Sequence, residues 1–180
     1  MAAFTQLISG KFRIYHAGSG VDFPNSWPAN VDTAPSGFTA IGNQLISTDG
    51  ITLGRSYTTN MEHVLAYAEP VSESLESVVH TISFDCLDMS SAFFALVTGN
   101  TAASGKLALA QAPGALPIIA VAIIGPGPKA DKLCAWHFAH ASVKIDGDTV
   151  LRGGNIARTP VMLTPLVGPS GKFGSYIVQS

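Results

Sequence analysis

The feature that most constrains the fold of this chain is an Asp49-Gly50 pair between two short runs of alternating side chains. Asp-Gly tolerates the positive φ angles of a two-residue type I′ turn and is therefore a strong signal for a β-hairpin. A turn at this point would place Ile46 opposite Leu53 and would give one mostly apolar and one mostly polar face. The segment 37–53 thus predicts a building block of an antiparallel sheet.

Further strands are predicted by side chains that alternate in character with a period of two. The clearest is 78–87, in which Ile82 lies on an apolar face. The opposite face is polar and carries Thr81, Ser83 and Asp85. The same pattern predicts strands at 11–16 and 132–145, and further strands are predicted at 106–112, at the β-branched run 118–124 and at 159–166. The prolines at 160 and 165 favour an edge position for the last strand.

One short helix is predicted after the strand 78–87. Asp88 or Ser90 can cap its N-terminus, and Gly99 can occupy the position that follows its last turn. An apolar stripe on the helix would consist of Met89, Ala92, Phe93, Leu96 and Val97.

The remaining segments are predicted to connect these elements. Residues 17–37 read as a loop, rich in proline and glycine, that Phe23 and Trp27 hold to the surface. Residues 1–10 are predicted to form an N-terminal arm. Residues 55–76 are interpreted as a strand followed by a long loop rather than a helix, and 167–180 as a tail that becomes ordered only against something else. The chain is therefore predicted to be one domain, residues 1–180, mainly β, with an antiparallel β-sandwich or barrel and one short flanking α-helix.

Composition limits the functions that this chain can have. Charged residues make up 12% of it, against roughly 25% in an ordinary soluble domain. Either neighbouring copies cover much of the outside, which we favour, or a compact monomer has a surface of Ser, Thr and Gly. No apolar run of about 18 residues and no secretory signal are visible, so no membrane partner is expected. With a net charge of −2, no basic patch for gripping phosphates is expected.

No constellation of residues predicts chemistry. His137 and His140 are three residues apart in a predicted strand and should lie on opposite faces, so they cannot share a metal ion without a bulge. Cys86 and Cys134 are interpreted as buried free thiols. No nucleophile motif is present, and prolines in 125–129 remove the amides that a phosphate cradle needs. We therefore expect no catalytic, cofactor-binding or metal-binding residues, and no enzymatic activity.

The order of these elements, and one motif, resemble a known family. Gly37-Phe-Thr-Ala-Ile-Gly42 leads into Ser47-Thr-Asp-Gly-Ile-Thr-Leu53, between a short N-terminal strand with its proline-rich loop and a long polar loop before the strand 78–87. This arrangement is similar to the major tail proteins, or tail tube proteins, of long non-contractile-tailed (siphovirus-type) bacteriophages, especially those of actinobacteria. The resemblance covers residues 10–166, and Thr48 stands where the family often has an acidic residue.

The resemblance implies a structural virion protein. Such a protein polymerises as stacked hexameric rings into the tail tube, through which double-stranded DNA passes without sequence-specific binding during genome ejection. It implies as partners further copies of the chain and the tail terminator, tape-measure and baseplate proteins. It implies location in the virion after assembly in the bacterial host cytoplasm. Candidate contacts between subunits and rings are Met61, Val64, Leu65, Tyr67 and Pro70. Thr81, Ser83 and Asp85 are candidates for facing the lumen.

Two alternatives remain open. One is another component of a tail or tube, such as a tail terminator, a baseplate ring protein or a secretion-tube homologue. The other is a small β-sandwich binding module or hydrolase.

Overall fold

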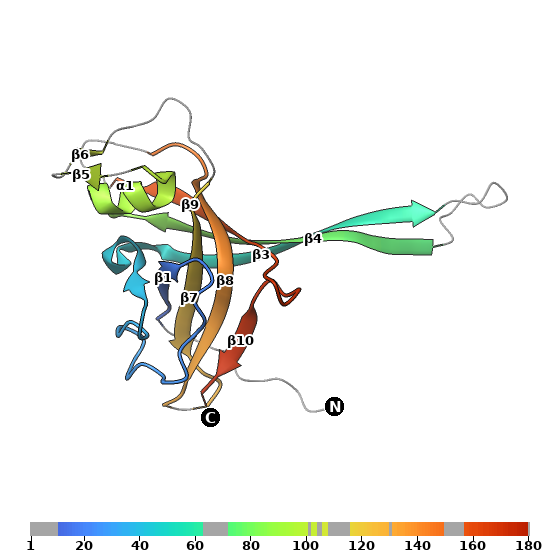
Figure 1. Cartoon of the computed structure of the whole chain (residues 1–180), viewed down its shortest axis with the longest axis horizontal. Coiled ribbons are helices and arrows are strands. Elements are labelled where there is room, and N and C mark those ends of the chain that lie inside the picture. The colour runs from blue at the N-terminus through green and yellow to red at the C-terminus, as the bar shows by residue number, and fades with distance from the viewer. Residues whose placement is uncertain are drawn as a thin grey trace.

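A computed structural model describes residues 11–62, 72–100, 102–103, 106–107, 116–129, 131–149 and 157–179. Its main element is an antiparallel sheet of eight strands in the order β2-β1-β7-β8-β9-β4-β3, with β10 paired to β8 (Figure 1). The sheet curls into a half-barrel, which confirms the prediction of a mainly β fold with one short helix. The strands of this sheet are β1 (Arg13–Gly18), β2 (Thr39–Ala40), β3 (Ile46–Glu62), β4 (Ser72–Cys86), β7 (Ile118–Pro126), β8 (Leu133–Ile145), β9 (Thr159–Pro165) and β10 (Ser175–Val178). The other elements are a short 3₁₀ helix η1 (Ile41–Gln44), α1 (Ser91–Thr98), and the two-stranded sheet of β5 (Ala102–Ala103) and β6 (Lys106–Leu107).

Both faces of the sheet are covered around β1 and β7. On one face, branched side chains of the strands form the main core together with Phe93 and Val97 of α1. On the other face, small side chains such as Ala120 and Ala122 lie under the loop 19–38. Both faces of β7 are therefore buried, which explains why it is almost uniformly apolar.

The loop 19–38 is fastened to the sheet as predicted. Phe23 and Trp27 pack against the buried cluster beneath the loop, with their ring centroids 5.2 Å apart. The Tyr15 hydroxyl donates a hydrogen bond to the Val31 carbonyl oxygen at 2.5 Å. Asp32 accepts a hydrogen bond from Arg13 Nε at 2.7 Å and forms an ion pair with Lys11. These two contacts join the loop to β1 and to the residues just before it. These hydrogen bonds to the two cations lower the pKa of the Asp32 carboxyl.

The predicted helix and both of its caps are confirmed. Ser90 Oγ accepts a hydrogen bond from the Phe93 amide at 3.2 Å, and Gly99 adopts a φ of 70° while its N–H donates to Ala95. Phe93 and Val97 are buried, as the stripe required. The prediction that Met89 belongs to this stripe is wrong, because Met89 precedes the helix and is 42% exposed.

The predicted hairpin at Asp49-Gly50 is wrong. β3 continues through these residues and pairs with β4, where Ile46 lies opposite Cys86 and Ile51 opposite Phe84. The four residues 47–50 therefore bulge out opposite Asp85, and Gly50 supplies a φ of 86°. The same backbone property that favours a tight turn also favours a bulge. β3 forms many more backbone pairs with β4 than the short strands beside a turn at Asp49-Gly50 could form with each other. The long pairing therefore determines the structure of this segment.

The long loop predicted for 55–76 is largely strand. Residues 55–62 continue β3, and 72–76 begin β4, in register from Ile51–Phe84 outward to Glu62–Ser72 with one irregularity near Thr58. The prediction of a strand in this segment holds for its first part, while 63–71 lie outside the described residues. Figure 1 shows this hairpin of β3 and β4 projecting far from the body of the molecule.

The predicted edge position of 159–166 is wrong, because β9 lies between β4 and β8. Its two neighbours are staggered: β4 pairs with 159–163 and β8 with 161–165. Pro160 and Pro165 therefore each lie beside a single paired strand. The stagger accommodates residues that cannot donate to a ladder on both sides.

The C-terminal segment is more ordered than the sequence predicts. Within 167–180, residues 175–178 form β10 and pair antiparallel with 134–137 of β8. Gln179 extends the attachment, because its amide donates to the Leu133 carbonyl and its side chain accepts from the Leu133 amide. The tail thus orders against its own chain. The predicted N-terminal arm 1–10 lies outside the described residues.

Candidate functional site

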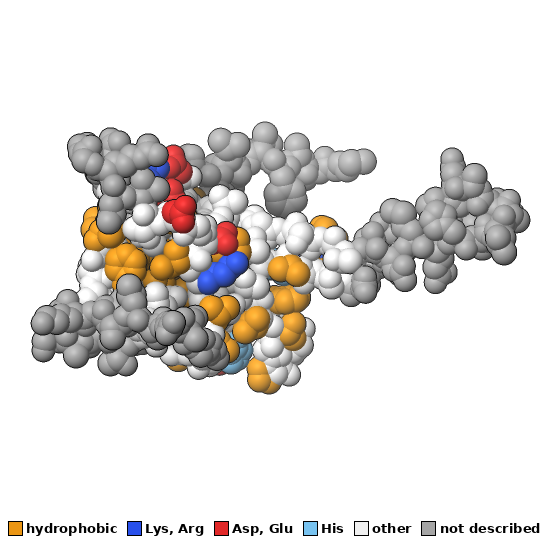
Figure 2. Space-filling model, turned by 90° about the horizontal axis from the view of Figure 1, so that it is seen from above, with side chains coloured by type: hydrophobic (Ala, Val, Ile, Leu, Met, Phe, Trp, Pro, Cys, Tyr) orange, Lys and Arg blue, Asp and Glu red, His pale blue; other side chains and the backbone are white. Residues whose placement is uncertain are grey.

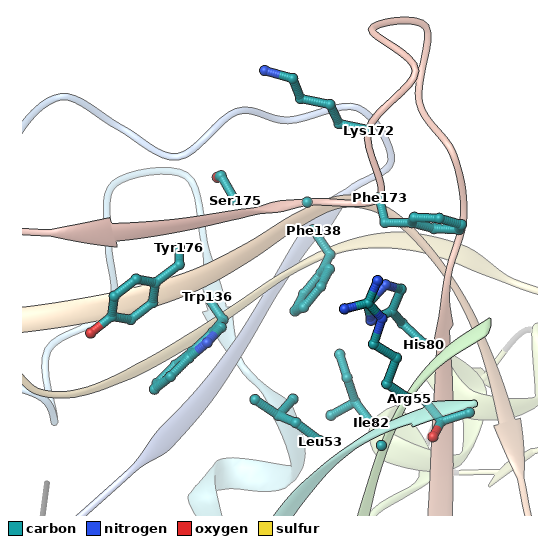
Figure 3. A pocket seen from close by; sticks show the side chains of 13 residues that line it. Leu53, Arg55, His80, Ile82, Trp136, Phe138, Lys172, Phe173, Ser175 and Tyr176 are labelled. Carbon is teal, nitrogen blue, oxygen red and sulfur yellow. The ribbon is translucent and has the colours of Figure 1, made fainter. Parts of the chain in front are cut away.

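An open groove of about 490 Å³ lies between the base of the β3–β4 hairpin and the C-terminal segment (Figure 3). β8 contributes Trp136 and Phe138, and the C-terminal segment contributes Phe173 and Tyr176. The hairpin forms the opposite wall. Its main side chains in the groove are Leu53, Arg55, His80 and Ile82. The groove therefore depends on segments that are far apart in sequence and that only the curled sheet brings together.

Aromatic side chains give the groove its shape. The Trp136 ring lies 4.9 Å from the Tyr176 ring, and the His80 ring lies 5.0 Å from the Phe173 ring, measured between centroids. Much of this apolar surface is in contact with solvent: Leu53 is 44% exposed and Tyr176 is 48% exposed. Contiguous exposed apolar surface is typical of a binding or association site.

The charges at the groove are all of one sign. Arg55 and Lys172 line it, and no Asp or Glu is among the described residues that line it. The Arg55 guanidinium lies 4.7 Å from the centroid of the Tyr57 ring. Tyr57 follows Arg55 two residues later along β3, on the same face of the strand. Within the part of the chain that the structure describes, neither Arg55 nor Lys172 forms an ion pair. The groove is thus aromatic in its walls and cationic at its rim.

The polar face predicted for β4 is present. Ile82, Phe84 and Cys86 are buried, while Thr81, Ser83 and Asp85 are partly exposed on the opposite face. The alternation read from the sequence is confirmed.

Asp85 lies in a small group of charges on this face. Its carboxylate is 3.8 Å from Arg158 Nη1, which also pairs with Asp49 at 2.7 Å. A hydrogen bond from Ser47, followed by the hydrogen bond and charge of Arg158, lowers the pKa of Asp49. Asp49 therefore stays ionised at neutral pH, and its pair with Arg158 ties the bulge of β3 to the start of β9.

Of the predicted contact residues, Met61 lies in the described part of the β3–β4 hairpin. The backbone of Met61 is in β3, opposite Glu73 of β4. Val64, Leu65, Tyr67 and Pro70 lie outside the described residues.

The two neighbouring histidines do not lie on opposite faces as predicted. β8 bulges where it pairs with β7: Ile119 lies opposite Ala141, but Val121 lies opposite Phe138. This shift brings both side chains against one loop. His137 Nε2 is 3.0 Å from the Val21 carbonyl oxygen, and His140 Nδ1 is 2.9 Å from Ser19 Oγ. No group of three His, Cys, Asp or Glu among the described residues is arranged to hold a metal ion.

Cys86 and Cys134 are buried free thiols, as predicted. Burial raises the pKa of both thiols, so each is protonated and unreactive at neutral pH. In the described part of the chain, no helix is long and apolar enough to cross a membrane.

Sequence reasoning did not find the groove. The alternation of Trp136 and Phe138 along one strand face was visible, but nothing in the sequence showed that 173–176 returns to that strand. No protein-family model matches the chain, and a search of curated proteins found no significant match. Function is therefore inferred from the sequence motif and from the surfaces described above.

Proposed function

We propose that this protein is a structural subunit of the tail tube of a long, non-contractile-tailed bacteriophage. Copies would associate as hexameric rings that stack into a tube, the conduit for double-stranded DNA during ejection. Its partners would then be further copies of itself and the tail terminator, tape-measure and baseplate proteins. It would reside in the virion after assembly in the host cytoplasm.

The observation that carries this proposal is the projecting β3–β4 hairpin on a half-closed antiparallel sheet (Figure 1). A two-stranded ribbon beyond the body gains little from its own packing, because an isolated hairpin is marginally stable in water. Such an extension is suited to contact another subunit.

The ends of the sheet also favour association. β3 and β2 are the outermost strands of the main path, and β3 is 17 residues long. A long edge strand has backbone groups free to pair with another chain, and monomeric proteins usually shorten, charge or cover such an edge. Curling the sheet into a half-barrel leaves it open for completion by neighbouring copies.

The surface is consistent with a subunit that is covered by its neighbours. On the face seen in Figure 2, few charged side chains are visible among the described residues, and hydrophobic side chains are interspersed between polar ones. The partly exposed polar face of Thr81, Ser83 and Asp85 remains our candidate for the lumen. Thr81, Ser83 and Asp85 do not bind phosphate as lysine and arginine do, and the neighbouring Arg158 is paired with Asp49, so this face would let DNA slide.

Light scattering and negative-stain electron microscopy of the purified protein test the proposal. Rings and tubes of indefinite length are expected, whereas a uniform monomer at high concentration would contradict it. Rings that never stack would favour a terminator or a baseplate ring protein. In a reconstruction of the tube, Asp85 should lie toward the six-fold axis, and an outward position would reject the lumen assignment.

Deleting Thr59 to Glu73 tests the role of the projecting end of the β3–β4 hairpin. We expect a folded subunit that no longer polymerises, and its far-ultraviolet circular dichroism spectrum should still be that of a β-sheet protein. Normal tubes from this variant would show that the hairpin is not an assembly element.

A further inference from the structure

The groove at the base of the hairpin has a chemical character that selects its occupant. Its walls are aromatic and its rim carries Arg55 and Lys172, and the lining residues that the structure describes include no Asp or Glu. Neither cation pairs with a carboxylate of the described residues, and both lie beside exposed apolar surface, so they favour a ligand that is both acidic and apolar. The occupant should therefore carry carboxylates next to hydrophobic side chains.

One segment of this chain has that composition. Between Arg55 and Lys106 the sequence contains no Lys or Arg. Within it, the outer hairpin, which we define as residues 57–77, is acidic as well as apolar. Its acidic residues are Glu62, Glu69, Glu73 and Glu76, and its larger apolar residues are Tyr57, Met61, Val64, Leu65, Tyr67, Val71 and Leu75.

The outer hairpin cannot enter the groove of its own chain. Leu53, Arg55 and His80 at the base of the same hairpin form one wall of that groove. From there the two strands stay paired outward to Glu62 and Ser72, and Figure 1 shows them leading away from the body. A paired ribbon does not fold back on its own base, so an occupant from this sequence must come from another copy.

We infer that the groove between the hairpin base and the C-terminal segment receives the outer hairpin of a second copy of this chain, with Arg55 and Lys172 facing its glutamates. The inference rests on the proposed function, in which copies associate, and assigns to that association a receptor surface. The contact is heterologous: a hairpin on one copy meets a groove on the next. Repeated from copy to copy, such a contact closes into a ring where the rotation allows it and otherwise continues along a filament.

Charge reversal at the rim tests the inference in the assembling protein. Exchanging both rim cations (Arg55→Glu, Lys172→Glu) should raise the protein concentration needed for assembly about tenfold or more, a change of about 1.4 kcal/mol in association free energy. Lys129→Glu is the matched control for Lys172→Glu, because Lys129 is an exposed lysine in the turn between β7 and β8, outside the groove. Normal assembly of the rim variant would overturn the inference.

A charge exchange separates a direct contact from damage to the fold. By itself, the double substitution Glu73→Arg, Glu76→Arg should impair assembly. Combined with Arg55→Glu and Lys172→Glu, it should restore assembly. A combined variant no better than either parent would contradict pairing between these groups. High salt should weaken assembly of the wild type more than that of the rim variant.

A peptide makes the test independent of tube formation. The probe is the segment 58–77 closed by cysteines in place of Thr58 and Ser77, which lie opposite each other in the hairpin. Added to full-length protein diluted until it is monomeric, it should change the fluorescence of Trp136 in the groove wall. The affinity should fall about tenfold in the rim variant and stay unchanged in Lys129→Glu.

The outcomes distinguish the two proposals. Peptide binding without rings or tubes from the wild type would refute the tube function and leave the groove assignment standing. Tubes from the wild type with no peptide binding, or with equal binding by the rim variant, would refute the groove assignment alone.

Discussion

Gly42 occupies a position where no side chain fits. Its φ is 53°, and a Cβ built there would overlap the sulfur of Cys86, a fully buried residue of β4. Glycine adopts this backbone conformation without the steric cost that other residues bear. Close contact between η1 and β4 therefore depends on one missing methyl group.

We expect Gly42→Ala to lower the free energy of unfolding by about 3 kcal/mol, the sum of backbone strain and overpacking. Gly37→Ala is the matched control: Gly37 also has a positive φ, 81°, but no atom lies within 4 Å of the place that a Cβ would take. It should lose only about 1 kcal/mol. Urea unfolding followed by circular dichroism measures both, and equal losses would show that the contact with Cys86 is unimportant.

Two partly or fully buried histidines make stability depend on pH. Burial lowers the pKa of His16 and of His137 below the ordinary value of 6.5; for His137, a hydrogen bond to Val21 and the charge of Asp22 act in the opposite direction. The unfolded chain then binds protons that the folded chain does not. The contribution of the two neutral histidines to the free energy of unfolding is complete above about pH 6.5 and is lost as the pH falls toward their lowered pKa values.

The melting temperature should therefore fall between pH 7.5 and pH 5. Asp32 and Asp49 have their pKa lowered below the ordinary 3.8, so they act only at more acidic pH. His137→Gln should flatten the dependence, since glutamine can still donate to the Val21 carbonyl but does not titrate. A melting temperature that is constant over this range would contradict a role for these histidines.

Among the elements, those with a local physical cause could be predicted. The strand 78–87 follows from alternation, and α1 follows from Ser90 and Gly99, because capping needs only neighbouring residues. The bulge at Asp49-Gly50 and the interior position of β9 could not be predicted, since each depends on a partner strand distant in sequence. The groove was hidden for the same reason: its walls come from β3, β4, β8 and the segment after β9.

The N-cap of α1 is a direct test at this scale. Ser90→Ala removes the acceptor for the Phe93 amide and should destabilise the protein by about 1 kcal/mol. Ser91→Ala, one residue later, should change stability by less than about 0.5 kcal/mol. Denaturant midpoints of the two variants give the comparison, and equal midpoints would show that the capping hydrogen bond does not stabilise this helix.

For the whole molecule, the two thiols report whether the sheet unfolds as one unit. Cys86 in β4 lies against Gly42 of η1, and Cys134 in β8 lies beneath Tyr176 of β10. Both belong to one sheet, so both should become reactive toward a thiol reagent over the same urea range. Single-cysteine variants with alanine at the other site allow each to be followed. If Cys134 became reactive at a lower urea concentration than Cys86, β10 would open separately from the rest of the sheet.

The pairing pattern also has a consequence for how the chain folds with time. The β3–β4 and β7–β8 hairpins join neighbouring segments, whereas β1 must find β7, with Arg13 opposite Ile124, and β9 must find β4, with Ile82 opposite Leu163. Contacts between distant segments form slowly because long loops must close first. The hairpin that we expect to act as a ligand can thus form early, while the groove that would receive it must wait for β8 and β10. This delay would keep partly folded chains from capturing one another.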